Sequence, residues 1–348
     1  MFSIRRVLHR LAFFLRFRYA SKAMWATLLV FFVAMLGGSL SAVILAPKLR
    51  AAGIVGQDLH KPAQPEIPEM GGLAFITGFT LAILFAIGLE AFLPQILPVD
   101  FVLLLAVLAT VLLTGLVGIL DDLLGLRQAV KAFLPVVAAL PLVAVRAGHT
   151  SLTIPFFGRV DFGLAYSLVL VPLGITGAAN AVNMLAGFNG LELGMSLVAM
   201  GALAALAAKL GATTALVILL AGGGAALGLL PLNWYPAKIF VGDVGTLSLG
   251  AILASSCIVG NFEAAGLIII IPYALDFLIK AAHGFPSRGW AGELGEDGKL
   301  YCPKNGPVGL AQAILKIHPL SERSLVLVLM GLEAVFAGLA LFLYFFRR

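Results

Sequence analysis

Long apolar runs recur along this chain from one end to the other. A helix needs about 20 apolar residues to cross a hydrocarbon core of about 30 Å, and these runs have that length. With 61% hydrophobic and 11% charged residues, the 348-residue chain carries more apolar surface than one globular core can bury. The sequence therefore predicts an all-α polytopic membrane protein and argues against a soluble helical bundle.

We expect about ten transmembrane helices, separated by polar loops. The predicted spans are residues 24–46, 70–94, 99–120, 130–147, 164–183, 190–208, 212–232, 244–260, 264–282 and 324–346. Counting alternately places the following loops on one membrane face: 47–69, 121–130, 184–189, 233–243 and 283–323. Lys and Arg number twelve on that face and five on the other, once residues 1–22 are set aside. The positive-inside rule then predicts an integral protein of the cell membrane, or of the endoplasmic reticulum in a eukaryote, whose active site faces the cytoplasm.

Residues 1–22 form a basic N-terminal arm in front of a single transmembrane domain at residues 23–348. The arm interleaves six Lys and Arg with large apolar side chains, a mixture typical of an amphipathic helix in the lipid interface. Its charge opposes the predicted orientation unless the arm lies flat on the membrane. The net charge of +6 fits anionic lipid or a phosphorylated substrate, and we expect no nucleic acid partner.

Two adjacent acids, Asp121 and Asp122, end the third predicted span. A carboxylate at the rim of a membrane segment is costly, so the pair is a candidate functional site. Adjacent helical residues point about 100° apart, which predicts different roles for the two carboxylates. Lys131 opens the next span, where its ammonium can meet a carboxylate or a phosphate. An ion pair that joins the two helices is the structural alternative.

Four further polar clusters lie on the same predicted face. The loop 57–72 is rich in proline and ends in two glycines that let the backbone turn into the second helix, although a plain connector has the same composition. Asn180 and Asn183 share a helix face, and their amides can ligate a hard cation or join membrane helices by hydrogen bonds. Asp243 either serves the site or caps the helix that follows it. The loop 283–323 has the length of a loop that covers a substrate.

Together these clusters offer carboxylates and amide oxygens for a divalent cation, with Lys and Arg for phosphate. Mg²⁺ prefers one or two protein carboxylates together with substrate phosphate oxygens and water, and Mn²⁺ is the alternative metal. The residues therefore favour phosphoryl transfer. A secondary transporter also uses intramembrane acids, but transport sites lie near the bilayer midplane, whereas these motifs all lie at helix ends. A structural subunit would not need acids and amides at one rim.

Five motifs follow one another in order, namely GQDLHK, IPEMGG, LDDLLGLR, NAVNMLAGFNGLE and NWYPAKIFVGD. With them the chain resembles the polyprenyl-phosphate N-acetylhexosamine-1-phosphate transferases over nearly everything after residue 45. It is most similar to the eukaryotic and archaeal branch, the UDP-N-acetylglucosamine–dolichyl-phosphate N-acetylglucosaminephosphotransferases. The bacterial branch usually has an aspartate where Ala186 stands, and its peptidoglycan-precursor members have a histidine-rich motif in the last cytoplasmic loop. Neither feature is present, which disfavours a muramyl-pentapeptide substrate.

The resemblance implies transfer of GlcNAc-1-phosphate from UDP-GlcNAc to dolichyl or another polyprenyl phosphate. This reaction is the first step of lipid-linked oligosaccharide assembly for protein N-glycosylation. Transfer of another UDP-N-acetylhexosamine, for a cell-envelope polymer, is the alternative. The expected partners are the sugar nucleotide, the lipid phosphate and membrane lipids, and a homodimer stays open.

By motif position, the resemblance also implies roles for individual residues. The catalytic group comprises Asp121, Asp122 and Lys131, with one acid orienting or deprotonating the lipid phosphate and Lys131 contacting phosphate. The metal ligands are Asn183 and Asp243. The nucleotide sugar is held by Gln57, Asp58, Leu59, Glu69 and Asn189, and the helix end that carries Asn180 lies along the lipid phosphate. The family's basic triplet falls at Ser287-Arg288-Gly289, where only Arg288 is basic, so nearby His283 is a candidate substitute.

Overall fold

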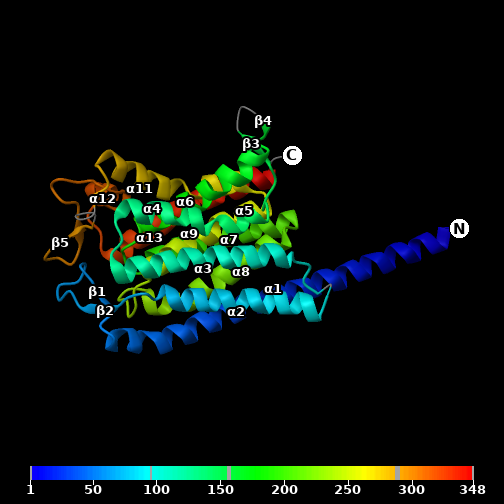
Figure 1. The fold of residues 1–348 in the computed structure, drawn as a ribbon, viewed down its shortest axis with the longest axis horizontal. Coiled ribbons are helices and arrows are strands. Elements are labelled where there is room, and N and C mark those ends of the chain that lie inside the picture. Colours follow the sequence, from blue (N-terminus) through cyan, green and yellow to red (C-terminus); the bar gives the residue numbers. More distant parts are fainter. Residues whose placement is uncertain (1, 95, 155–157, 287–290, 347–348) are drawn as a thin grey trace.

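The computed structural model describes residues 2–94, 96–154, 158–286 and 291–346, and of residues 2–23, 153 and 154 it describes the backbone alone. Over these residues the chain is a bundle of long helices with three short hairpins in its loops (Figure 1). The helices are α1 (Phe2–Ala51), α2 (Gly72–Phe92), α3 (Phe101–Leu124), α4 (Gln128–Ala138), α5 (Leu140–Ala144), the π-helix η1 (Tyr166–Leu170), α6 (Val171–Leu185), α7 (Leu191–Leu210), α8 (Thr213–Asn233), α9 (Gly242–Gly260), α10 (Glu263–Ile269), α11 (Ile271–Ala282), α12 (Leu310–Ile317) and α13 (Glu322–Phe346). The antiparallel hairpins pair β1 (Val55–Gln57) with β2 (Glu66–Pro68), β3 (Ser151–Ile154) with β4 (Gly158–Asp161), and β5 (Glu293–Leu294) with β6 (Leu300–Tyr301).

Eight helical segments among the described residues are long and apolar enough to cross a membrane, and a ninth span results if α10 and α11 count as one. These two helices are bent by 57° at their junction. Pro272 is the cause that the sequence offers, because proline removes a backbone donor and clashes with the preceding turn. The remaining predicted segment is the shorter apolar stretch Gln128–Ala144, which α4 and α5 share. The prediction of an all-α polytopic membrane protein is confirmed.

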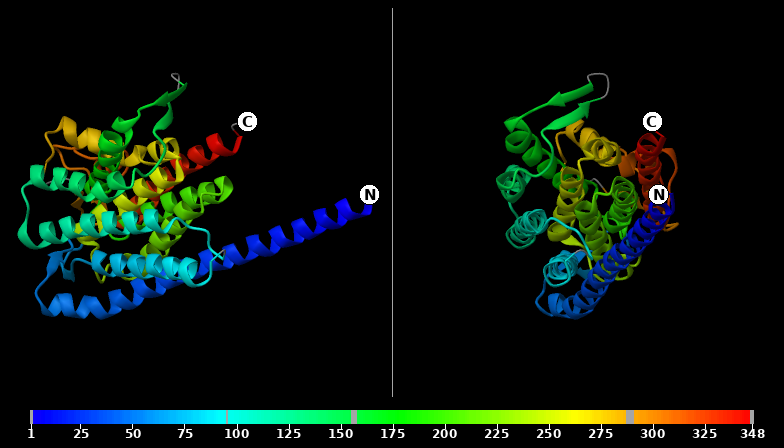
Figure 2. Two further views of the ribbon diagram at one scale, coloured as in Figure 1. Left: turned by 45° about the vertical axis from the view of Figure 1, so that its right-hand side comes forward. Right: turned by 90° about the vertical axis from the view of Figure 1, so that its right-hand side faces the viewer.

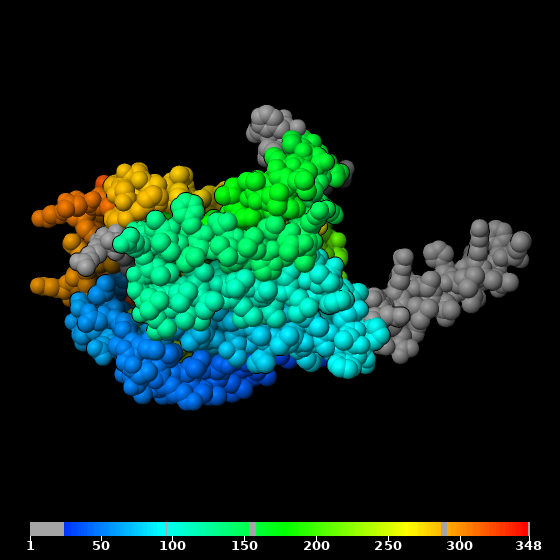
Figure 3. All heavy atoms as spheres, viewed as in Figure 1, coloured from blue at the N-terminus to red at the C-terminus, as the bar shows by residue number. Residues whose placement is uncertain are grey.

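The loops predicted on one membrane face meet at one end of the bundle, the site end. The hairpins β1–β2 and β5–β6 and the short helix α12 lie there, whereas β3–β4 stands at the opposite end (Figures 1 and 3). The loop 283–323 therefore contains regular structure in addition to connecting chain. Helix α3 continues through both acids to Leu124 and ends at Gly125, whose φ of 61° lies in the left-handed region.

Helix α9 is the most enclosed of the eight spans, because 83% of its 18-residue apolar stretch is buried. The end-on view shows other helices around it (Figure 2). Two glycines bring neighbouring helices against its first turn. A Cβ at Gly72 would lie 2.2 Å from the Gly245 nitrogen, and one at Gly118 would lie 2.3 Å from the Val244 Cα. The two glycines that end the loop 57–72 were predicted to ease a turn. Gly72 instead allows close helix packing, and the residue with a positive φ, 64°, is Met70.

Candidate active site

A cavity of about 410 Å³ opens at the site end, between the β1–β2 loop and the ends of α4, α6, α9 and α11. It gathers side chains that lie far apart in the sequence. The predicted site residues that line it are Gln57, Asp58, Leu59, Glu69, Lys131, Asn183, Asn189 and Asp243. The polar motifs of four loops and helix ends therefore share one chamber.

Lys131 ties three helices together at the floor of this cavity. Its Nζ lies 2.5 Å from Asp121 Oδ2 at the end of α3, and it also forms an ion pair with Asp243 Oδ2 in the first turn of α9. The interhelical ion pair considered as an alternative is thus present, together with a second carboxylate from α9. An ammonium between two carboxylates neutralises only one of their two charges.

Asp122 holds the start of α9. Its Oδ1 accepts a hydrogen bond from the Asp243 backbone N–H at 2.9 Å, and its Oδ2 accepts one from the Val244 N–H at 3.2 Å. These N–H groups have no partner within their own helix, because the first turn of a helix lacks acceptors for them. A carboxylate from α3 therefore caps α9, and Asp243 itself is not the cap. The two side chains therefore contact different partners: Asp121 contacts Lys131, and Asp122 contacts the backbone of α9.

The oxygen donors around Lys131 fit a hard divalent cation. Asp121 and Asp243 present carboxylate oxygens that share the one ammonium of Lys131. Asn183 also lines the cavity, and its buried Nδ2 has no hydrogen-bond partner among the described residues. Among the described residues, therefore, no hydrogen bond from that nitrogen fixes the direction in which the amide oxygen points. Carboxylate and amide oxygens are the ligands that Mg²⁺ accepts in proteins.

The chain that follows β2 is fixed on the segment that precedes Asp243. The N–H groups of Gly71 and Gly72 donate to the carbonyls of Phe240 and Val241, each at 2.7 Å. This seating brings Glu69 beside Asp122. Burial, followed by the negative charge of Asp122, raises the pKa of Glu69 above its ordinary value.

Comparisons with known proteins identify the family of this chain. A family model described as glycosyl transferase family 4 matches residues 104–261. The chain is 33% identical over 320 residues to a Saccharolobus solfataricus protein named as a candidate UDP-N-acetylglucosamine–dolichyl-phosphate N-acetylglucosaminephosphotransferase, covering 91% of this chain and 97% of that protein. This chain belongs to glycosyl transferase family 4. The resemblance drawn from the five motifs is therefore confirmed.

Two further relatives represent different branches of the family. The enzyme of Schizosaccharomyces pombe named UDP-N-acetylglucosamine–dolichyl-phosphate N-acetylglucosaminephosphotransferase is 29% identical over 259 residues, 64% of this chain and 54% of that protein. The phospho-N-acetylmuramoyl-pentapeptide-transferase of Limosilactobacillus fermentum is 35% identical over 219 residues, 61% of this chain and 66% of that protein. The match to the Saccharolobus protein covers much more of both chains than either of these does.

Five predicted site residues are not in the described lining of the cavity, namely Asp121, Asp122, Asn180, Ser287 and Arg288. Asn180 donates through Nδ2 to the carbonyls of Ala132 and Thr176, at 3.0 and 2.9 Å, so its amide joins α6 to α4. Ser287 and Arg288 lie outside the described residues. His283 is exposed, and its Nδ1 lies 2.8 Å from the Ile279 carbonyl of the preceding helix. Contacts of these residues with a substrate stay predictions.

Lys280 lines the cavity, although the motifs gave it no role. Its ammonium forms an ion pair with Asp276 at 2.7 Å and donates to the Met184 carbonyl, next to Asn183. Asp276 in turn accepts from the Leu310 N–H at 2.8 Å, where α12 begins. The signal in the sequence was an acid and a base four residues apart in an apolar segment, a spacing that places both on one helix face.

Proposed function

We propose that this protein transfers N-acetylglucosamine-1-phosphate from UDP-GlcNAc to dolichyl or another polyprenyl phosphate. The products are lipid-pyrophosphate-GlcNAc and UMP, as the first step of lipid-linked oligosaccharide assembly for protein N-glycosylation. The observation that carries the proposal is the single cavity that joins the β1–β2 loop to Lys131, Asn183 and Asp243. The relatives named for this reaction support the same donor and acceptor. The position of the cavity at helix ends also favours a transferase over a transporter.

In this reaction an oxygen of the lipid phosphate attacks the β-phosphorus of UDP-GlcNAc. The new bond joins that oxygen to the β-phosphorus, and the bond from the β-phosphorus to the bridging oxygen breaks, so the electron pair leaves with UMP. A phosphate monoester is already mostly dianionic at pH 7, since its second pKa is about 6. The nucleophile therefore needs positioning and charge neutralisation more than deprotonation. We assign neutralisation to Lys131 and Lys280, which both line the cavity.

Asn183 and Asp243 would hold Mg²⁺, with Asp121 close enough to Lys131 to belong to the same group of charges. Bound there, the ion would draw charge from the phosphate oxygens of the donor. Asp122 acts on this group through the backbone of α9, because it fixes the turn that carries Asp243.

A second cavity, of about 530 Å³, supports a polyprenyl acceptor. It lies between α6, α9, α10 and α11, and its lining is almost entirely apolar. Ala181 and Phe277 line this groove, while Asn183 and Lys280, half a turn to a turn further along the same two helices, line the active-site cavity. Leu267 on its wall is 68% exposed, so the groove reaches the surface of the bundle. A lipid chain in the groove would leave its phosphate at the active-site cavity.

The test is UMP release by the purified full-length protein with Mg²⁺ and a polyprenyl phosphate. UDP-GlcNAc should be the best donor in a panel that includes UDP-GalNAc, UDP-MurNAc-pentapeptide and UDP-glucose, judged by kcat/KM. Chelation should abolish turnover and added Mg²⁺ should restore it, with Mn²⁺ as the second metal tried. The Asp243→Ala variant should be inactive while it stays folded in detergent. A different best sugar would correct the substrate alone, and no reaction with any donor would refute the transferase.

A further inference from the structure

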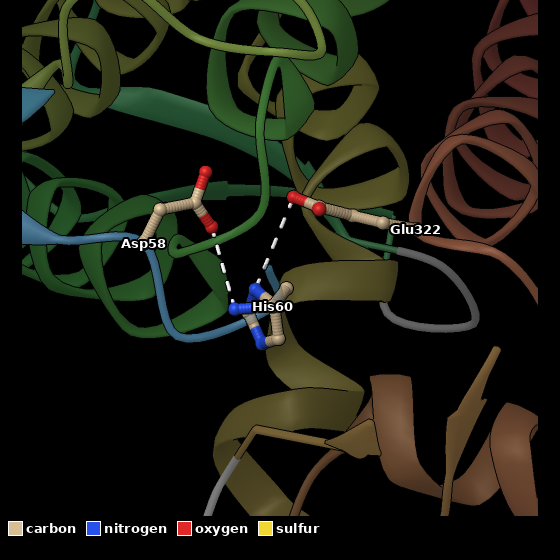
Figure 4. A group of neighbouring side chains, drawn as sticks. All are labelled: Asp58, His60 and Glu322. Atoms are coloured by element: carbon tan, nitrogen blue, oxygen red, sulfur yellow. Dashed lines mark hydrogen bonds and ion pairs between the residues drawn. The ribbon is translucent and has the colours of Figure 1, made fainter. Parts of the chain in front are cut away.

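A buried cluster beside the active-site cavity has the composition of a second metal site. Asp58, His60 and Glu322 are 3, 6 and 4% exposed, and one potential ligand atom of each lies within 4.8 Å of the others. Figure 4 shows His60 beside both carboxylates: its backbone N–H donates to Asp58 Oδ1 at 3.3 Å, and its Nδ1 lies 3.9 Å from Glu322 Oε1. Asp58 comes from the β1–β2 loop and Glu322 from the first turn of α13. Three such groups together are a common ligand set for a divalent metal.

Lys61 supplies a cation to both carboxylates of this cluster. Its Nζ lies 2.9 Å from Asp58 Oδ2 and 2.6 Å from Glu322 Oε2, and its side chain is only 11% exposed. The ammonium is therefore the cation of this cluster. Burial lowers the pKa of His60, which outweighs the opposing effect of Glu322 and Asp58, so the ring is neutral at pH 7. We name the ion-paired group Asp58, Lys61 and Glu322 the loop clasp, since it fastens the β1–β2 loop to α13.

The loop clasp holds Asn189 from two sides. The Asn189 backbone N–H donates to Glu322 Oε1 at 2.7 Å, and its Nδ2 donates to Asp58 Oδ2 at 3.3 Å. Its Oδ1 accepts from the Ala237 N–H at 2.6 Å. A carboxylate can only accept and a backbone N–H can only donate, so these partners fix which end of the amide is nitrogen and which is oxygen.

The fixed amide still has capacity for a ligand. A primary amide carries two N–H groups and two oxygen lone pairs, and the contacts described use one of each. Asn189 lines the cavity, whereas Lys61 and Glu322 are not in its described lining. The loop clasp therefore sets which end of this cavity-lining amide can donate to a ligand and which end can accept from one.

We infer that Lys61 and Glu322 are positioning residues for the nucleotide half of the donor, acting through Asp58 and Asn189. This inference rests on the proposed function, in which the donor is a uridine nucleotide. The pairing edge of uracil offers an N–H beside a carbonyl oxygen, while cytosine offers a ring nitrogen beside an amino group, the reverse order. An amide whose N–H and oxygen are fixed in position pairs with the edge of one base and leaves the edge of the other base unpaired. Such a site discriminates strongly between uracil and cytosine. An amide free to flip would accept either.

A second contact extends the loop clasp to the segment that holds Asn189 Oδ1. The ammonium of Lys61 lies 4.2 Å from the centre of the Tyr235 ring, and the Arg323 guanidinium lies 4.6 Å from the same ring. Arg323 also donates to the Tyr235 carbonyl at 3.2 Å. The segment that ends at Ala237 is thus fastened to the start of α13 by the same neighbours.

The test compares UMP and CMP binding to the full-length protein in detergent, together with steady-state kinetics. Lys61→Met should weaken UMP binding by roughly tenfold, a usual size for coupling between linked positions, and should narrow the preference for UMP over CMP. The KM for donor should rise, while kcat at saturating donor and the KM for lipid phosphate should stay within about twofold of wild type. Lys61→Arg keeps the charge and should recover much of the preference.

Glu322→Gln provides a milder second variant, should Lys61→Met fold poorly with two buried acids unpaired. Its side chain keeps an oxygen that can accept from the Asn189 N–H but loses the charge that pairs with Lys61, and the UMP preference should again narrow. Lys299→Met is the matched control, since Lys299 is 50% exposed and pairs only loosely with Asp297, at 3.6 Å. The control should bind and react as wild type does.

Three outcomes would overturn the inference. One is a loss of thermal stability and kcat in both variants with the UMP-to-CMP ratio unchanged, which would make the loop clasp structural only. Another is variants that match the Lys299 control. The third is bound metal that disappears in His60→Ala and increases in Lys61→Met, since the cluster would then be a metal site. If wild type neither binds UMP nor releases it from UDP-GlcNAc, the proposed function fails instead.

Discussion

At the end of α3, Asp121 Oδ2 lies 2.5 Å from Lys131 Nζ, while both oxygens of Asp122 accept backbone N–H groups of α9. One acid therefore takes part in the charge balance of the site and the other holds a helix end. Both contribute to the position of Asp243, but by different routes.

Asp121→Asn and Asp122→Asn should consequently fail in different ways. The asparagine at position 122 can offer only one oxygen to α9, so we expect a stability loss of about 1 kcal/mol, the usual size for a lost helix cap, seen as a lower Tm. Asp121→Asn should change Tm less and lower kcat by roughly 100-fold, as when one electrostatic group of an active site is lost. Thermal unfolding and UMP release measure the two effects. Equal and small losses at both positions would contradict the division of roles.

Lys131 competes with any cation for the oxygens of Asp121 and Asp243. In Lys131→Met the two carboxylates lose the ammonium that they share, so Mn²⁺ should bind the substrate-free protein more tightly, by about tenfold. Turnover should nevertheless fall, because a phosphate contact is lost. Electron paramagnetic resonance titration of Mn²⁺ measures the affinity without any reaction.

The control for this measurement is Lys280→Met. Lys280 lines the same cavity, but its ammonium contacts Asp276 and the Met184 carbonyl. Its removal should leave Mn²⁺ affinity close to that of wild type. An unchanged affinity in Lys131→Met would mean that the ammonium and the metal do not share these oxygens.

At the scale of elements, the site depends on how closely α2 and α3 approach the first turn of α9. Gly72→Ala would place a Cβ 2.2 Å from the Gly245 nitrogen, which forces the helices apart. We expect a Tm several degrees lower, since overpacking costs about 1–3 kcal/mol, and reduced UMP release because α9 carries Asp243. Gly88→Ala on the same helix has nothing within 4 Å of the new Cβ and should leave both properties intact. A tolerated Gly72→Ala would show that this approach is not needed.

The sequence predicts the helices better than it predicts their partners. The apolar runs locate the spans, because a lipid-facing helix must be apolar over its whole length. Pro272 marks the break between α10 and α11, yet the stretch was expected to be a single span. The capping of α9 by Asp122 and the ion pair of Lys61 with Glu322 join residues 121 and 261 positions apart. No local pattern encodes such contacts, which only the folded bundle creates.

The site shows the same limit at residue level. Residue types and motif order predicted that Lys131, Asn183 and Asp243 belong together, and one cavity contains all three. Lys280 was missed because a base at a helix end in a membrane protein is usually read as a topology signal. Asn180 has the right residue type, but its amide is used between α6 and α4. A side chain's chemistry is visible in the sequence, whereas the partner that uses it is not.

For the whole molecule, the distribution of charge predicts the orientation in the membrane, and a native cysteine can test that prediction. Cys302 is partly exposed in the loop after β6 at the site end, and Cys257 is buried within α9. Lys and Arg concentrate in the loops of the site end, so the positive-inside rule predicts that Cys302 is on the cytoplasmic side. A membrane-impermeant maleimide should therefore label the protein in inside-out vesicles and not in intact cells.

Cys257 should stay unlabelled in both preparations, because burial within the bundle denies the reagent access. Cys302→Ser should remove the signal and identify the labelled thiol. Labelling of Cys302 in intact cells would reverse the orientation and place the active-site cavity on the outer face. The labelling pattern thus tests the predicted topology independently of catalysis.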